Sequence, residues 1–353
     1  MNYETELDDL IMTLVKEAGS DLHLTVGSFP TVRVIGELIP LTRKKELTGE
    51  DTVGFLRTMV PEKLFTAFVI KQELDFSYSH RKEYRLRCNA SFQKGVVSIS
   101  LRLITKAKSV SDLNLPEKLI EIARSREGFF LVVGPMGQGK STTIAAMISL
   151  INQESKKHIV TIEDPIEYMF AQDKSLIEQR EVGIDTKDFH VALTSCLRQD
   201  VDVIMIGEMR DKDTISTAVT AAETGHLVLS TLHTNSASQT IDRIIDSFPS
   251  DQQNQIRTQL AASLLGVLSQ RLIPRVSGGM LPVCELLLNT PAVANIIREN
   301  RTHEIDVMIE TGTNEGMIDF NRELARHVRS GDILPEVAME RSRKPDLLRK
   351  LLS

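Results

Sequence analysis

The opening of the chain has the three- and four-residue spacing of an amphipathic helix, and strand-like patterns follow it. The apolar positions of this helix, which is predicted to end near Gly19, are Leu7, Leu10, Ile11, Leu14 and Val15. Later stretches are rich in apolar and β-branched residues, as strands are. These predicted strands are Asp21 to Val26, Thr31 to Ile35, Tyr84 to Asn89 and Val96 to Ile104. The hydroxyl of Thr48 can cap another helix that runs toward Met59. Residues 1–108 are therefore predicted to form a small α+β domain.

The rest of the chain alternates short apolar runs with helical segments such as Ser141 to Asn152. The apolar runs are Gly128 to Val133, His158 to Ile162, Val201 to Ile206 and His226 to Leu232. Continuous apolar strands of this kind are buried on both faces of a mostly parallel sheet, so residues 116–290 are predicted to form a doubly wound α/β domain. Lys106 to Leu115 has no periodicity, which places a linker at 109–115 before Pro116 starts a helix. Helical spacing after Pro291 predicts a helical C-terminal region, 291–353.

Composition narrows the class of protein. The chain has 353 residues, of which 41% are hydrophobic and 25% charged, as expected for about two globular domains. Its 42 basic and 48 acidic residues leave a net charge of −6, which disfavours nucleic acid as a partner. The acidic first ten residues do not resemble a secretory signal, and no apolar stretch is long enough to span a bilayer, so we expect a soluble, cytoplasmic protein. Three isolated cysteines predict neither a disulfide framework nor a cysteine zinc site.

One segment has a complete phosphate-binding pattern. Gly134-Pro-Met-Gly-Gln-Gly-Lys-Ser141 matches G-x-x-x-x-G-K-[ST] and stands between an apolar strand and a helix. In such a loop, glycines let backbone N–H groups converge on phosphate, and the lysine, here Lys140, reaches the outer phosphates. The serine hydroxyl, here Ser141, is a ligand for Mg²⁺. The predicted nucleotide-binding residues are Gly134, Pro135, Gly137, Gly139, Lys140, Ser141 and Thr142. Strand, loop and helix in this order make a chance glycine-rich turn an unsatisfactory alternative.

Acidic residues follow two further strands. Glu163 and Asp164 come after one of them, where open α/β sheets bind ligands, so Glu163 is a candidate general base for hydrolysis. Two acids that cap a helix ahead of Pro165 would leave the same pattern. Glu208 ends the apolar strand that begins after Asp202 and is predicted to engage Mg²⁺, directly or through water.

Histidines and arginines provide weaker signals. His226 and His233 bracket a strand at a spacing that does not suit a helical zinc pair, and either a surface histidine or a sensor of the γ-phosphate fits their position. Arg87 and Arg102 lie on predicted strands of the first domain. They are either ordinary exposed charges or arginines that reach, from a neighbouring subunit, the charge that develops as the γ-phosphoryl group leaves.

Taken together, the motifs resemble those of the secretion ATPases, and most closely the type IV pilus retraction ATPases of the PilT and PilU type. The matching stretches are Gly19-Ser-Asp-Leu-His-Leu24, Gly134 to Thr142, Val160 to Tyr168, Leu197 to Asp200, Gly207 to Asp211, Ala221 to His226, Thr231 to Asn235 and Ala294 to Glu299. They span nearly the whole chain, and their combination is far more specific than the phosphate loop alone.

The resemblance implies a PAS-like first domain, a RecA-like second domain and a hexameric ring that hydrolyses ATP with Mg²⁺. It assigns catalytic roles to Glu163, Glu208 and His233, and Arg87 and Arg102 match first-domain arginines aimed at nucleotide. His226 is implied to bind nucleotide. The implied partners are a PilC-like platform protein of the inner membrane and a paralogous retraction ATPase. The implied location is cytoplasmic, peripheral at the inner-membrane base of the pilus machine.

The chain departs from the family in places, and other functions compete. Met136 and Gln138 replace the family's usual Thr and Ser, and Asp200 to Asp202 lacks its usual proline. Some stretches are closer to PilU and others to PilT. An extension or type II secretion ATPase would usually carry a four-cysteine metal-binding insertion. A small-molecule phosphotransferase would be a compact monomer or dimer, and an ATP sensor would not hydrolyse its ligand.

Overall fold

The computed structural model describes residues 2–34, 36–81, 84–104 and 107–353. The described chain divides into two compact units, Met1–Lys106 with Pro165–Met169, and Ala107–Asp164 with Phe170–Ser353. Ile35, the end of one predicted strand, and Lys106, the start of the predicted unpatterned stretch, lie outside the described residues. None of the described helices is both long and apolar enough to cross a membrane.

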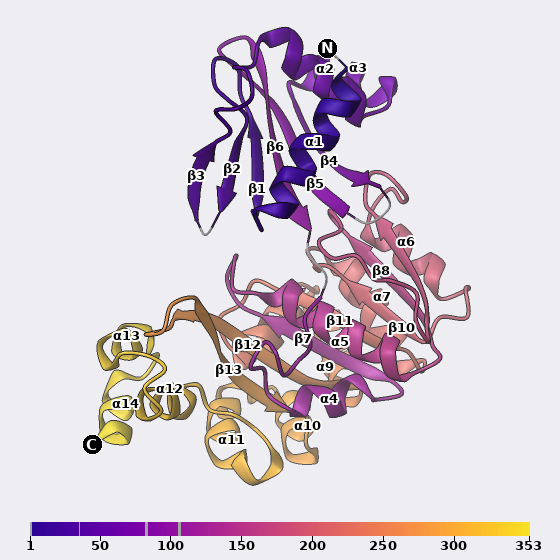
Figure 1. The fold of residues 1–353 in the computed structure, drawn as a ribbon. Coiled ribbons are helices and arrows are strands. Elements are labelled where there is room, and N and C mark those ends of the chain that lie inside the picture. Colours follow the sequence, from indigo (N-terminus) through magenta and orange to yellow (C-terminus); the bar gives the residue numbers. More distant parts are fainter. Residues whose placement is uncertain (1, 35, 82–83, 105–106) are drawn as a thin grey trace. The chain divides into compact units, whose positions relative to one another are not determined.

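The first unit is one antiparallel sheet with three helices (Figure 1). Its elements are α1 (Tyr3–Lys16), β1 (Asp21–Leu24), β2 (Thr31–Val34), β3 (Glu37–Pro40), α2 (Gly49–Met59), α3 (Glu62–Lys71), β4 (Glu73–His80), β5 (Tyr84–Gln93) and β6 (Val96–Ile104). The strand order is β3-β2-β1-β6-β5-β4. The predicted cap is present, because the Thr48 side chain accepts from Asp51 N and the Asp51 side chain accepts from Thr48 N. The predicted helix and strands of this unit are confirmed, and β3, β4 and α3 are additional.

Alternation along the strands of the first unit separates a core face from an open face. On β5, Leu86, Cys88 and Ala90 are buried in the core, whereas Arg87, between them in sequence, is exposed. Of the predicted stripe of α1, all residues but Val15, which is half-buried, join this core. Because successive side chains of a strand point to opposite faces, one face of the sheet packs against the helices and the other is left polar.

The second unit contains a seven-stranded sheet and most of the helices. Its elements are α4 (Lys118–Ala123), β7 (Gly128–Val133), α5 (Lys140–Glu154), β8 (His158–Glu163), β9 (Leu176–Glu181), α6 (Phe189–Cys196), β10 (Val203–Ile206), α7 (Lys212–Glu223), β11 (Leu227–Leu232), α8 (Ala237–Asp246), α9 (Ser250–Ser263), β12 (Leu264–Pro274), β13 (Met280–Leu288), α10 (Pro291–Arg298), η1 (Thr302–Glu304), α11 (Ile305–Thr311), η2 (Gly312–Glu315), α12 (Phe320–Arg329), α13 (Pro335–Arg341) and α14 (Pro345–Leu352). The strand order is β13-β12-β7-β11-β10-β8-β9, with all pairs parallel except β12–β13.

Helices cover both faces of this sheet, as the apolar runs predict. Phe129 and Leu131 of β7 pack into one core, and Phe130 and Val132, the intervening residues, pack into another. All six residues of β7 are buried, as they must be in a central strand with helices on both faces. The mixed α/β class is confirmed. The β12–β13 hairpin and β9 are additions to the predicted sheet, and α4 begins at Lys118 rather than at Pro116.

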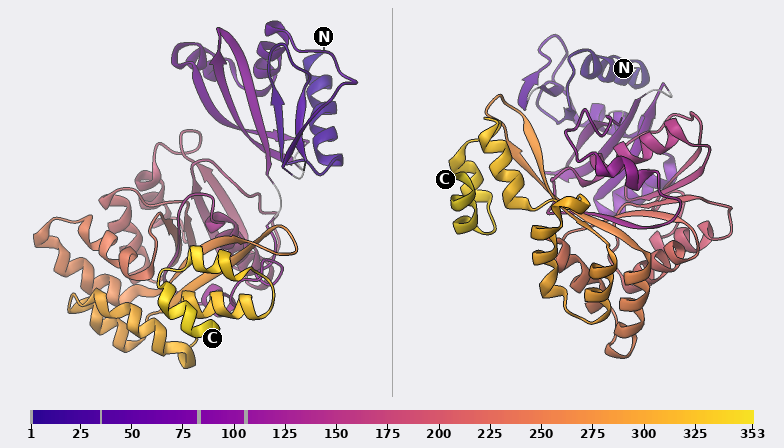
Figure 2. Two further views of the ribbon diagram at one scale, coloured as in Figure 1. Left: turned by 90° about the vertical axis from the view of Figure 1, so that its left-hand side faces the viewer. Right: turned by 90° about the horizontal axis from the view of Figure 1, so that it is seen from below.

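The last helices form a separate small core against the β12–β13 hairpin (Figure 2). Its buried residues are Ile273, Leu281, Val283, Phe320, Leu324, Ala325, Ile333, Ala338 and Leu348. Residues from the hairpin and from α12, α13 and α14 all contribute to this core. These helices are therefore packed onto the β12–β13 hairpin, and β12 pairs with β7, the strand that the phosphate loop follows.

Candidate nucleotide-binding site

The loop between β7 and α5 has the backbone shape that phosphate binding requires. Gly134 has a φ of 151°, and a Cβ there would lie 2.5 Å from the carbonyl oxygen of Gln270, so no side chain fits. Gly139 is left-handed, with a φ of 77°, and as the residue before α5 it provides no side-chain cap. A helix start of this kind presents N–H groups and a positive dipole end, to which an anion is the natural partner.

Lys140 lies folded over this loop. Its ammonium donates to the carbonyl oxygens of Gly134 and Pro135, each at 2.9 Å, and Nζ lies 3.4 Å from Nδ1 of His233. The residue is only 7% exposed, although a charged side chain is rarely buried without partners. The lysine is thus held where the loop would place phosphate oxygens. Ser141 and Thr142 follow it in the first turn of α5.

Strand β12 braces the loop through one buried amide. Gln270, 2% exposed, donates from Nε2 to the carbonyl oxygen of Gln138 at 2.8 Å and accepts at Oε1 from the Thr143 hydroxyl at 2.7 Å. In return, the side chain of Gln138 accepts from the backbone N–H of Leu272 at 2.7 Å. These bonds join the loop, the start of α5 and β12 into one rigid group. Gln138, which departs from the family pattern, is therefore structurally engaged.

Glu208 and His233 lie beside the loop at the ends of the two neighbouring strands. His233 Nε2 is 3.5 Å from Glu208 Oε2, while its Nδ1 faces Lys140. Because an ammonium can only donate, His233 Nδ1 is the acceptor in its contact with Lys140. Arg210 also pairs with Glu208, and this hydrogen bond raises the pKa of the Arg210 guanidinium. These residues border a cavity of about 520 Å³ that extends to α8.

Glu163 is at the end of β8, one strand further from the loop. The residue is 4% exposed, and its carboxylate accepts from the Thr161 hydroxyl at 2.7 Å and from Gln179 Nε2 at 3.3 Å. The parallel register sets Ile162 opposite Ile206, so Glu163 stands beside the backbone that leads to Glu208. No helix begins in the described stretch 164–175, so the helix-capping interpretation of Glu163 and Asp164 is wrong.

His226 and His233 lie at opposite ends of β11, and so on opposite sides of the sheet along the strand direction. His233 follows the carboxyl end of β11, whereas His226 precedes its amino end and its Nδ1 pairs with the carbonyl oxygen of Ala221 at 2.9 Å. Leu227 is in register with Gly128, the first residue of β7, and the phosphate loop follows the last. Six strand residues at about 3.3 Å each put roughly 20 Å between His226 and that end of β7. His226 therefore does not border the phosphate loop of its own chain, and its role in nucleotide binding stays a prediction.

Arg87 and Arg102 are direct cross-strand partners on the open face of the first unit's sheet. Arg102 Nε donates to Asp21 Oδ1 at 2.8 Å, and Arg87 Nη1 lies 3.6 Å from Glu167 Oε1. Like charges opposite each other on a sheet are unfavourable, so this pairing has a cost that the two carboxylates offset. The separation of fifteen residues in sequence does not predict that the two arginines are paired. The register of β5 against β6 sets them opposite each other.

Oxygen ligands for magnesium are present at the same edge. In the parts of the chain that the structure describes, no three His, Cys, Asp or Glu side chains form a ready-made metal cage. Mg²⁺ needs no such cage, because it is usually held by one or two protein oxygens together with substrate phosphates and water. Ser141 at the start of α5 and Glu208 after β10 supply that donor type.

Fold and loop together define a P-loop ATPase of the α/β class. The chain belongs to the family described as "Type II/IV secretion system protein", whose sequence pattern matches residues 74–320. It is 39% identical to the type IV pilus ATPase PilU of Pseudomonas aeruginosa, covering 98% of this chain and 91% of PilU. It is also 39% identical to the type IV pilus retraction ATPase PilT of the same organism, covering 97% and 99%. A crystal structure of the pilus retraction motor PilT with bound ADP superposes with a TM-score of 0.91 at 43% identity, covering 97% of this chain and 98% of that one.

Sequence reasoning missed the residues that support the site rather than form it. Gln270 and Gln179 belong to no motif, and each reaches the site from another strand; Asn235 ends the Thr231 to Asn235 stretch but had no role assigned to it. One signal was available: Ser269-Gln270-Arg271 interrupts an otherwise apolar stretch from Leu264 to Ile273. A polar group in a buried strand requires a partner, and that requirement could have marked Gln270.

Gln270→Ala is expected to weaken nucleotide binding without unfolding the unit. The substitution removes the two side-chain bonds that Gln270 makes to the loop and to α5 and leaves the bond from Leu272 N to Gln138. Ordering of the loop must then be driven more by the ligand, at a cost of about tenfold in affinity. Titration with a fluorescent ADP analogue measures the change. Gln153→Ala, an exposed position near the end of α5, is the matched control. Unchanged affinity in the Gln270 variant would show that the loop holds its shape unaided.

Proposed function

We propose that this chain is a type IV pilus retraction ATPase, a motor that converts ATP hydrolysis into the disassembly of pili. The observation that carries the proposal is the match, over nearly the whole of both chains, to a pilus retraction motor that holds ADP. The phosphate loop, Lys140, His233 and Glu208 of this chain are clustered at one sheet edge, as ATP chemistry needs. Equal identity to PilT and PilU supports the class that the two share.

In this proposal the loop binds the polyphosphate. The N–H groups of the loop and of the first turn of α5, from Gly137 to Thr142, converge on the phosphates, with Gly134 and Pro135 shaping the turn. Lys140 exchanges its carbonyl partners for phosphate oxygens, since an ammonium gains more from charged acceptors than from neutral ones. Ser141 and Glu208 would hold Mg²⁺, which would supply positive charge to offset that of the phosphates.

Glu163 is the proposed general base. Its carboxylate takes a proton from water as that water forms a bond to the γ-phosphorus and the bond to the ADP oxygen breaks. Thr161 and Gln179 donate to one carboxylate oxygen and so fix the orientation of the group. His233 lies between Lys140 and Glu208, a position from which loss of the γ-phosphate alters its partners.

The active form is proposed to be a hexameric ring. Arg87 and Arg102, paired on an exposed face of the first unit, would approach the nucleotide of a neighbouring subunit and balance the charge of the departing phosphoryl group. We assign residues 1–108 to a PAS-like domain, 109–115 to a linker, 116–290 to a RecA-like domain and 291–353 to a helical region. The proposed partners are a PilC-like platform protein of the inner membrane and a paralogous retraction ATPase, with the ring at the membrane base of the pilus.

Lys140→Ala and Glu163→Gln are expected to fail at different steps. Without its ammonium the loop loses its main cation, so Lys140→Ala should lose both nucleotide binding and turnover. Glu163→Gln keeps the shape and should bind ATP while hydrolysing it about 10²- to 10⁴-fold more slowly. Fluorescent nucleotide titration and phosphate release separate the two effects. Glu178→Gln, on the exposed side of β9, is the control. Hydrolysis at full speed by Glu163→Gln would contradict its role as base.

Specific activity is expected to rise with protein concentration as rings form. Arg87→Ala and Arg102→Ala should each lower turnover about tenfold or more within assembled rings, because a charge contributed to the transition state is removed. Size exclusion with light scattering, run with and without ATP, reports assembly, and Arg57→Ala on α2 is the control. A monomeric preparation with undiminished specific activity would remove the need for arginines from a neighbour and would favour a phosphotransferase-like enzyme.

Deletion of the gene in its own cells is expected to leave excess surface pili and no twitching motility. A retraction motor removes pilin subunits from existing fibres, so its loss leaves extension unopposed. Electron microscopy of surface pili and a surface-spreading assay provide the measurements, and complementation with the Lys140→Ala form should not restore the wild type. Loss of all pili would identify an extension ATPase instead.

A further inference from the structure

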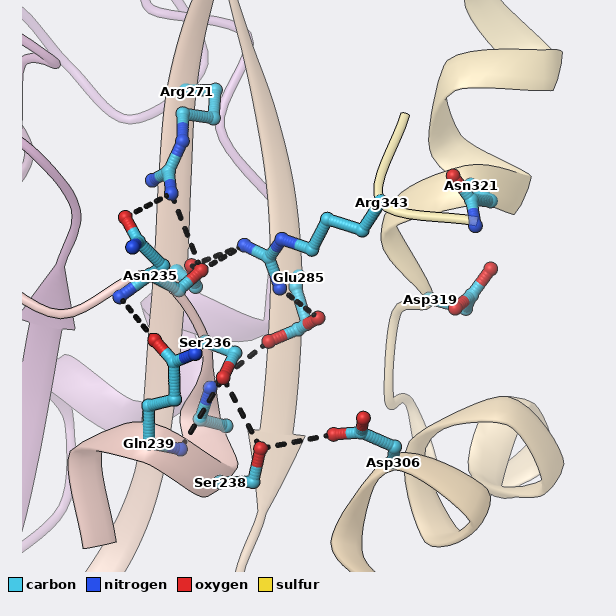
Figure 3. Close-up of polar contacts among 12 residues, drawn as sticks. Asn235, Ser236, Ser238, Gln239, Arg271, Glu285, Asp306, Asp319, Asn321 and Arg343 are labelled. Carbon is cyan, nitrogen blue, oxygen red and sulfur yellow. Dashed lines mark hydrogen bonds and ion pairs between the residues drawn. The ribbon is translucent and has the colours of Figure 1, made fainter. Parts of the chain in front are cut away.

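The loop between β11 and α8, residues 233–236, carries His233, and three donors converge on one of its backbone carbonyls, that of Asn235 (Figure 3). The carbonyl oxygen of Asn235 accepts from the Ser269 hydroxyl at 2.9 Å, from Arg271 Nη2 at 3.3 Å and from Arg343 Nη2. Arg271 also donates to the side-chain oxygen of Asn235 at 2.9 Å. Three donors on one carbonyl, two of them cationic, restrain the loop only two residues from His233.

Arg343 reaches this loop from the far end of the chain. It lies between α13 and α14, and its guanidinium spans three groups that belong to different elements (Figure 3). Besides Asn235, Nη1 donates to Glu285 Oε2 at 2.7 Å, and Nη2 donates to the Ser269 hydroxyl at 3.0 Å. The guanidinium carbon lies 4.9 Å from the centre of the Phe320 ring on α12. The planar fork of arginine suits such multiple contacts, and the single ammonium of lysine does not reproduce them.

Glu285 connects Arg343 to the start of α8. Its Oε1 accepts from the backbone N–H of Ala237, the first residue of that helix, at 3.0 Å. Burial raises the pKa of Glu285, and Arg343 and the Ala237 N–H oppose that shift. The carboxylate thus engages the positive end of α8 with one oxygen and Arg343 with the other. The C-terminal half of the 233–236 loop, at Asn235 and at Ala237 directly after it, is tied to the same guanidinium–carboxylate pair.

Resting on the proposed function, we infer that Arg343 is a positioning residue for hydrolysis. It holds the 233–236 loop, and with it His233, in register with Lys140 and Glu208, so the C-terminal helices act on the rate of turnover. None of the contacts of Arg343 described above involves the phosphate loop, residues 134–139. We call the contacts of Arg343 with Asn235, Ser269 and Glu285 the clamp. The clamp is therefore expected to affect the geometry around the reacting phosphate and to leave nucleotide affinity almost unchanged. Displacements of about 1 Å in a supporting shell are known to cost up to a hundredfold in rate.

Four variants of the full chain test this inference. Arg343→Ala removes the clamp, and Arg343→Lys keeps the charge without the fork. Arg343→Ala combined with Glu285→Gln leaves no buried carboxylate without its cation, so it removes the clamp while guarding against unfolding. Arg341→Ala, an exposed arginine two residues earlier that pairs only with neighbouring Glu340, is the matched control among the described residues.

The expected pattern separates positioning from general damage. Arg343→Ala and the double variant should lower kcat about ten- to hundredfold, with KM and the affinity for a fluorescent ADP analogue within about twofold of wild type. Arg343→Lys should recover part of the loss. Hydrogen exchange measured by mass spectrometry should rise in the peptide covering 233–238 in both clamp-free variants, but not in Arg341→Ala. Light scattering confirms that assembly is equal in all of them.

Contrary results fall into distinct groups. Wild-type kcat in the double variant, or equal loss of affinity and turnover, would overturn the inference and leave the proposed function intact. Unchanged exchange at 233–238 after removal of Arg343 would show that the loop is not held by the clamp. A wild-type ring that binds ADP without hydrolysing ATP would overturn the proposed function, and with it the expected effect on turnover. Hydrogen exchange at 233–238 would then still test whether Arg343 holds the loop.

Discussion

Strand β12 is the element on which the geometry of the nucleotide site depends, because three consecutive residues of it hold two different loops. Side chains of a strand alternate between faces, so Gln270 points one way and Ser269 and Arg271 the other. Gln270 holds the backbone of the phosphate loop and the first turns of α5, and its two neighbours hold Asn235 in the loop after β11. A shift of β12 would move both loops together. The strand itself is fixed by parallel pairing with β7 and by its hairpin partner β13.

The charged groups at this edge form an ordered series rather than isolated pairs. Lys140, His233, Glu208 and Arg210 alternate in character across the ends of three strands, and each has a neighbour of complementary sign or hydrogen-bonding capacity. In a partly buried site such a series is stable only when every member is satisfied, because an orphaned charge there costs several kcal/mol. Binding of a polyphosphate would introduce up to four negative charges next to Lys140. In the proposed function the partners of His233 would then change, because Lys140 is one of them.

The C-terminal helices are joined to the site through the β12–β13 hairpin. Their own apolar core rests on the β12–β13 hairpin, so the hairpin is shared between a packing role and the site. Glu285 on β13 is buried beside that core with Arg343 as its cation. Burial, together with the nearby Arg343, lowers the pKa of Arg271 to about 10, and the Glu285 carboxylate opposes this shift. Such an arrangement holds its shape through hydrogen bonds to backbone carbonyls as much as through ion pairing.

What the sequence determined by itself is the chemistry that lies in contiguous stretches. The phosphate loop, the acids at Glu163 and Glu208, and the alternation of apolar runs with helices were all readable, because parallel strands bring their carboxyl ends to one edge whatever their order. Tertiary structure alone decided the pairing of Arg87 with Arg102, which is a matter of register, and the bracing by Gln270 and Arg343, whose hydrogen-bond partners lie 58 to 132 positions away in sequence. It also separated His226 from His233, since six strand residues put them at opposite ends of β11. Local patterns record period and chain order, whereas contacts of this range arise only when the hairpin and the last helices close on the sheet.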